Sequence, residues 1–63
     1  MGEKLLLRPE EAAEAVGIGR TEVFRLIRNG ELESVMVGAR RRRIPVDALR
    51  DYVRRLREAA AAR

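Results

Sequence analysis

The chain has 63 residues, near the lower size limit for a domain that folds without a disulfide or a metal ion. It contains no cysteine and no histidine, which excludes disulfides and thiolate or imidazole metal sites. Its apolar side chains are mainly aliphatic, so they can fill a small core but cannot enclose a substrate cavity. We expect one domain over residues 1–63, with a core at about 5–57 and a frayed tail at 58–63.

The positive charge is concentrated in the second half of the chain. The formal net charge is +4, but residues 34–63 contain nine Arg against three acidic residues, whereas residues 1–19 have a net charge of −2. All basic residues but one are Arg, whose planar guanidinium makes bidentate contacts to phosphate and guanine that Lys cannot match. A cationic half on a small domain indicates an anionic polymer as its partner.

The sequence shows no sign of membrane insertion. No apolar run reaches the roughly 18 residues of a membrane span, and the N-terminus lacks the apolar stretch of a secretory signal. We expect a cytoplasmic protein without a membrane partner.

The first predicted elements are a short extended segment and a helix. The apolar run Leu5–Leu7 precedes Arg8 and Pro9, and a residue before proline is held extended, which favours a brief strand or an extended lead-in. Pro9 suits the first position of a helix that runs to about Val16, where Gly17 can form a left-handed C-cap. Small residues give this helix a packing face: Ala12, Ala13, Ala15 and Val16.

A second helix is predicted from Arg20 to about Asn29. Gly19 occupies its N-cap position, Gly30 ends it, and Ile18 is placed to plug the core at the turn. The helix has a buried stripe at helical spacing, formed by Val23, Leu26 and Ile27. Two short helices joined by a glycine-containing turn form the helix-turn-helix pattern, although many helical hairpins share it.

The opposite face of the second helix carries polar side chains: Arg20, Thr21, Glu22, Arg25 and Arg28. Such side chains can donate to and accept from base edges and phosphates. On this stretch alone, an amphipathic helix with a solvated polar face is the simpler interpretation.

A β-hairpin is predicted next, followed by a third helix. Leu32–Val37 is apolar and β-branched, Gly38-Ala39 forms a turn, and Arg40–Ile44 returns as the paired strand. Pro45 then opens a helix from Val46 or Asp47 to about Glu58. Its predicted apolar stripe consists of Leu49, Tyr52, Val53 and Leu56.

The four consecutive arginines of the hairpin, Arg40 to Arg43, have three interpretations. They could form a basic localisation segment, a membrane-surface patch, or a wing that contacts DNA. The hairpin lacks apolar residues to insert beside the charges, which argues against a membrane, and four adjacent arginines repel one another unless an anion lies across them. Side chains alternate along a strand, so Arg42 leans inward if Ile44 enters the core. We expect Arg40, Arg41 and Arg43 to face DNA.

The arginines of the third helix have a simpler interpretation. Arg50, Arg54, Arg55 and Arg57 can form a solvated face, partly paired with Asp47, Asp51 and Glu58 one turn away. We favour this interpretation over direct DNA contact.

Catalysis is not expected. The only acid clusters are carboxylates on helix surfaces, and Glu10, Glu11 and Glu14 lack a second group to complete a metal site. Glu10 and Glu11 are explained by the positive end of the first helix. We therefore predict no enzyme activity, no catalytic residue, no metal, no cofactor and no small-molecule ligand.

Taken in order, these motifs resemble the small winged helix-turn-helix domains of the excisionase and MerR-like group. The resemblance covers about residues 5–53, and its motifs are PEEAAEAVGI, EVFRLIRNGEL, the wing VMVG…RRIP and the closing DALRDYV. It implies a mainly α fold with a small β-hairpin: a short N-terminal strand, a helix-turn-helix, a two-stranded wing and a C-terminal helix.

The resemblance also implies roles for individual residues. The base-edge candidates are Arg20, Thr21, Glu22 and Arg25, and the backbone or groove candidates are Arg28, Arg40, Arg41 and Arg43. Phe24 stands where the family often has Tyr and is expected to be half-buried. The chain departs from the family at Arg8 and Gly19, where Ser or Thr caps are common, at Glu22, where a small polar residue is common, and in its wing, which lacks an aromatic residue.

A domain of this kind without an effector or enzymatic domain resembles an excisionase, which binds near an attachment site, bends the DNA and directs an integrase toward excision. The implied partners are double-stranded DNA, further copies of the protein on adjacent sites, and an integrase, with a nucleoid-associated location. A small MerR-like transcriptional regulator is the nearest alternative. A protein-interaction module that docks its basic third helix into an acidic groove is a more distant one.

Overall fold

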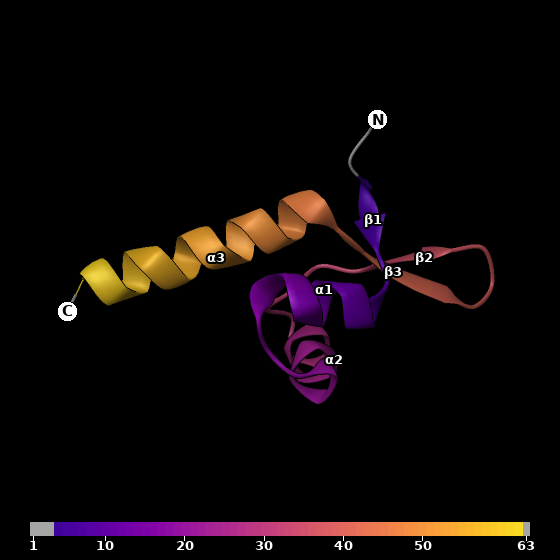
Figure 1. Cartoon of the computed structure of the whole chain (residues 1–63), viewed down its shortest axis with the longest axis horizontal. Coiled ribbons are helices and arrows are strands. Elements are labelled where there is room, and N and C mark those ends of the chain that lie inside the picture. The colour runs from indigo at the N-terminus through magenta and orange to yellow at the C-terminus, as the bar shows by residue number, and fades with distance from the viewer. Residues whose placement is uncertain (1–3, 63) are drawn as a thin grey trace.

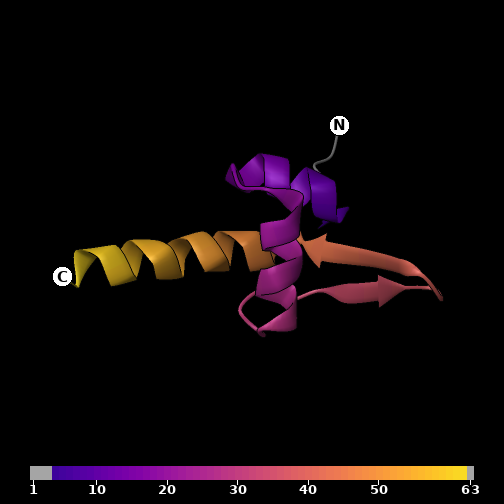
Figure 2. The same ribbon diagram turned by 90° about the horizontal axis from the view of Figure 1, so that it is seen from below.

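The computed structural model describes residues 4–62, which form three helices and a small antiparallel sheet (Figure 1). The elements in chain order are β1 (Leu6–Leu7), α1 (Pro9–Val16), α2 (Arg20–Arg28), β2 (Val35–Val37), β3 (Arg41–Pro45) and α3 (Val46–Ala61). The hairpin β2–β3 extends from one side of the helical body and α3 from the other (Figures 1 and 2). This is the predicted winged helix-turn-helix architecture. No helix in the described part of the chain is long and apolar enough to cross a membrane.

The ends of α1 follow from local chemistry. Pro9 is its first residue, and the backbone N–H of Arg8 donates to Glu11 Oε1 at 2.9 Å, which is the bond that the third helical residue makes in a capping box. Gly17 ends the helix with a φ of 90° and donates its N–H to the Ala13 carbonyl at 2.8 Å. The predicted left-handed C-cap is confirmed.

The segment after α2 differs from the prediction. Gly30 ends the helix with a φ of 77°, as expected, but β2 begins at Val35 and not at Leu32. The backbone N–H of Leu32 donates to the Leu26 carbonyl at 3.2 Å, so this residue folds back onto the end of α2. Its side chain is buried, because an apolar residue at this point fills the core more effectively than it would extend the wing.

The sheet has the strand order β1–β3–β2, with both pairs antiparallel. Leu7 lies opposite Ile44, so the N-terminal segment adds a third strand to the predicted hairpin. Arg40 lies in the turn of residues 38–40 and not in the strand, which corrects its predicted place. Pro45 ends β3 and leads directly into α3.

The core lies where α1, α2, β3 and the first turns of α3 meet. Its buried residues are Ala12, Ala13, Val23, Leu26, Leu32, Ile44, Ala48 and Leu49. Ile18, predicted to fill the core at the turn, and Ile27, predicted to be buried on α2, are both only half-buried against this core. Ala15, predicted to lie on the packing face of α1, is exposed.

The predicted stripe on α3 is only partly buried. Leu49 is in the core and Tyr52 packs against it, but Val53 is 39% exposed and Leu56 is 50% exposed. The reason is geometric: α3 continues past the body, so no other helix or strand of residues 4–62 covers its later turns (Figures 1 and 2). It reaches Ala61, three residues beyond the predicted end, because alanine is a strong helix former.

Candidate nucleic-acid interface

The polar face of α2 is the first part of the candidate interface. Val23 and Leu26 anchor the helix in the core, which turns the opposite side of α2 outward. In Figure 2, α2 runs across the point where β3 meets α3, with the wing extending to one side of it and α3 to the other. Arg20, Thr21, Arg25 and Arg28 are exposed, and Glu22 is partly exposed.

Two of the predicted base-edge residues are paired with each other. Arg25 Nε donates to Glu22 Oε1 at 3.1 Å, and its Nη2 atom contacts the second carboxylate oxygen. This hydrogen bonding lowers the pKa of Glu22 and raises the pKa of Arg25, so both groups stay charged. Glu22 and Arg25 therefore form a bidentate unit on the outer face of α2, which the sequence pattern did not reveal.

Arg20 lies at the start of α2 and is held by two neighbours. Its Cζ atom is 4.8 Å from the centroid of the Phe24 ring, and its Nε atom is 3.8 Å from Glu10 Oε1 of α1. Phe24 is half-buried, as predicted, and supports the guanidinium through a cation–π contact. Arg28, the last residue of α2, has no carboxylate partner among the described residues.

The wing arginines fall into two kinds. Arg40 and Arg41, at and beside the turn, are exposed and have no carboxylate partner within residues 4–62. Arg42 leans inward, as predicted: it is half-buried and donates to Ser34 Oγ at 2.6 Å. Arg43 was expected to be as available as Arg41, but it is half-buried and donates to the Arg42 carbonyl at 2.9 Å. Arg40 and Arg41 are therefore the wing cations best placed to meet an anion.

On α3, the structure shows the expected pairing of arginines with acids. Arg50 Nη1 lies 3.7 Å from Asp47, Arg54 contacts Asp51, and Arg54 Nη1 lies 3.4 Å from Glu58. These pairs are exposed and each contributes little to stability, but they offset the positive charge of this helix. The interpretation of a solvated, partly paired face fits these contacts.

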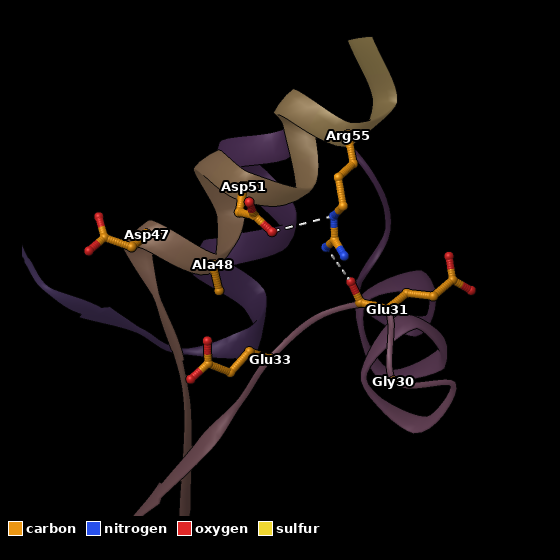
Figure 3. Close-up of a pocket in the computed structure, with 7 residues that line it drawn as sticks. All are labelled: Gly30, Glu31, Glu33, Asp47, Ala48, Asp51 and Arg55. Atoms are coloured by element: carbon orange, nitrogen blue, oxygen red, sulfur yellow. Dashed lines mark hydrogen bonds and ion pairs between the residues drawn. The ribbon is translucent and has the colours of Figure 1, made fainter. Parts of the chain in front are cut away.

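A pocket between α3 and the loop after α2 is acidic (Figure 3). Its carboxylates belong to Glu31, Glu33, Asp47 and Asp51. Arg55 lies among them, with Nη2 donating to the Glu31 carbonyl at 2.8 Å and Nε 3.4 Å from Asp51 Oδ2. Arg55 thus connects α3 to the loop that follows α2 through a hydrogen bond. In the described part of the chain, no three of these acids converge in a way that would hold a metal ion.

These charges distinguish the sides of the domain. The acidic pocket would repel a phosphate backbone, whereas α2 and the wing present Arg28, Arg40 and Arg41, which have no carboxylate partner among residues 4–62. A family model described as a helix-turn-helix domain matches residues 6–57, which is most of the chain.

The chain belongs to the helix-turn-helix domain family. This family binds DNA and is not a catalytic family. A curated relative named "Probable excisionase", from Saccharopolyspora erythraea, is 51% identical over 53 residues. The match covers 84% of this chain and 53% of the relative, so this helix-turn-helix chain spans about half the length of that protein. No solved structure matches the chain.

Proposed function

We propose that this protein binds a specific sequence in double-stranded DNA and acts as an excisionase. One observation carries the DNA-binding part of the proposal: α2 presents an outward polar face, and the adjoining wing carries two exposed arginines that have no carboxylate partner among the described residues. In this arrangement α2 lies in the major groove, which is wide enough for a helix, and the wing follows the flanking backbone or minor groove.

The residues of α2 divide by their place on the helix. Base edges are read by four side chains from its N-terminal part: Arg20, Thr21, Glu22 and Arg25. An arginine that makes two hydrogen bonds to guanine is the most common specific contact, and a glutamate accepts from the cytosine amino group. The Glu22–Arg25 unit could therefore read both partners of one G·C pair.

The remaining arginines supply affinity by contacting phosphate. These are Arg28 on α2 and Arg40, Arg41 and Arg43 on the wing. Phosphate contacts fix the position of a protein on the duplex without reading its sequence. Because Gly19 gives α2 no side-chain cap, a DNA phosphate can complete that helix end.

The excisionase role is architectural. Several copies bind adjacent sites near an attachment site, bend the DNA and contact an integrase. Bending by tens of degrees costs on the order of a few kcal/mol, which cooperative binding must offset. The exposed later turns of α3 are the surface we assign to a neighbouring copy or the integrase. The relative's curated name, "Probable excisionase", supports a role in excision.

A recombination assay tests the role. The integrase of the same genetic element is incubated with a substrate carrying both attachment sites, with and without this protein. We expect excision only when the protein is present. Equal excision in its absence contradicts the excisionase role, and DNA binding that changes only transcription from a nearby promoter would assign the protein as a regulator.

A further inference from the structure

The tip of the wing exposes two apolar side chains. Met36 is 48% exposed and Val37 is 41% exposed, although the sequence suggested a hairpin without apolar residues to insert beside its charges. Both lie in β2, and Val37 directly precedes the turn of residues 38–40. The end of the wing is therefore amphipathic and not merely basic.

The strand register places one apolar residue on each face of the wing. Val37 lies opposite Arg41 on one face, and Met36 lies opposite Arg42 on the other. Arg41 is exposed, whereas Arg42 is held by Ser34, so the available charge accompanies Val37. Arg40 in the turn adds a second exposed cation at the same end.

The dimensions of the wing and of DNA restrict how this tip can bind. Paired strands lie about 4.8 Å apart before any side chain is added. The minor groove of B-DNA is about 6 Å wide, so the tip enters it only if the groove opens. A tip that rested on the phosphates at the rim would leave Met36 and Val37 in water, whereas insertion buries them.

We propose that the wing tip enters the minor groove. Val37, which shares its face with the exposed Arg41, acts as an apolar wedge at a base step, and Met36 packs against the groove wall from the opposite face. Apolar wedges of this kind partly unstack the bases and kink the duplex toward the major groove, where α2 would lie. Arg40 and Arg41 hold the phosphates on either side of the opened groove. This inference rests on the proposed DNA binding and identifies the residues that bend the DNA.

The wedge predicts a separation between bending and binding. Replacing both residues with polar side chains of similar shape, Met36→Gln and Val37→Thr, keeps the strand and the arginines but removes the wedge. The matched control is Leu5→Gln, which changes an apolar side chain that is 79% exposed and lies away from the wing. Circular dichroism verifies that each variant folds. If the double variant does not fold, the two single variants replace it, and each is expected to lose part of the effect.

The probe is a 40-base-pair duplex that the protein selects from a random library, with a donor and an acceptor dye at its ends. Anisotropy reports affinity and energy transfer reports bending in one titration. We expect the double variant to bind about 3- to 10-fold more weakly and to lose at least half of the rise in energy transfer, with the control unchanged. 2-Aminopurine scanned through the site should brighten at one step with the original protein and not with the double variant.

Three outcomes would overturn the wedge. If the double variant bends the duplex as much as the original protein does, Met36 and Val37 are not inserted. If the original protein binds no duplex at all, the proposed DNA binding fails together with the wedge. If it binds phosphatidylserine–phosphatidylcholine vesicles, the double variant does not, and DNA bending is unchanged, the apolar tip serves a membrane surface.

Discussion

Arg25 and Glu22 form an ion pair on the outer face of α2, with Arg25 Nε 3.1 Å from Glu22 Oε1. The Glu22 carboxylate places a negative charge on the surface that we propose faces DNA, where it should weaken binding to duplexes that lack the specific site. It also fixes the Arg25 guanidinium, which reduces the conformational entropy that a base contact would cost.

Replacing Glu22 with Gln should therefore separate affinity from specificity. We expect binding to a scrambled duplex to strengthen by about 3- to 10-fold at low salt, because a repulsive charge is removed. Binding to the specific site should change less, so the ratio of the two affinities falls. Anisotropy titrations with both duplexes measure this ratio, and an equal gain on both would show that Glu22 reads no base.

Replacing Arg25 with Ala should weaken binding to the specific site by about 1–3 kcal/mol and relax the preference at one base pair. The physical reason is the loss of two hydrogen bonds to one base edge. Selection of duplexes from a random library, before and after the substitution, identifies that base pair. If the selected sequences are the same, Arg25 does not read a base.

The wing arginines should behave differently. Arg41→Ala is expected to weaken binding to all sequences about equally, because its partner is phosphate. Arg43→Ala is the matched comparison and should have a smaller effect, since Arg43 already donates to the Arg42 carbonyl and is half-buried. If Arg41→Ala alters sequence preference in the way that Arg25→Ala does, the division between α2 and the wing is wrong.

Local chemistry explains which parts of this fold can be predicted from the sequence. Pro9, Gly17 and Gly30 act within one turn of the chain, so the bounds they set are visible without a tertiary structure. The candidate α2 face follows in the same way, since the buried stripe fixes which residues point outward.

Long-range contacts explain what could not be predicted. Pairing of Leu7 with Ile44 joins segments far apart in the sequence. The local sequence around Leu32 is typical of a strand, and only the tertiary structure shows that its side chain is buried in the core. The stripe on α3 is helical whether or not a neighbour covers it, so its spacing could not show that Val53 and Leu56 are exposed. Side-chain pairs such as Arg55 with the Glu31 carbonyl depend on how the helices pack.

Acid should destabilise the fold through Glu11. The Lys4 ammonium, which donates to Glu11 Oε2 at 2.5 Å, and the Arg8 backbone N–H together lower the pKa of Glu11 to about 2. Because the pKa is lower in the folded state, the charged carboxylate stabilises the fold above about pH 4.5, and this contribution is lost as the pH falls toward 2. Urea unfolding at several pH values should show a flatter acid limb for Glu11→Gln. Identical acid limbs would show that this carboxylate does not contribute.

The most direct test of DNA binding is the salt dependence of duplex affinity. With roughly four to six phosphate contacts, the logarithm of the association constant should fall against the logarithm of the salt concentration with a slope of about −4 to −5. Arg41→Ala should reduce the steepness of that slope by about 1. A flat response, or no binding to duplex DNA at low salt, would contradict the assignment of α2 and the wing as a DNA-binding surface.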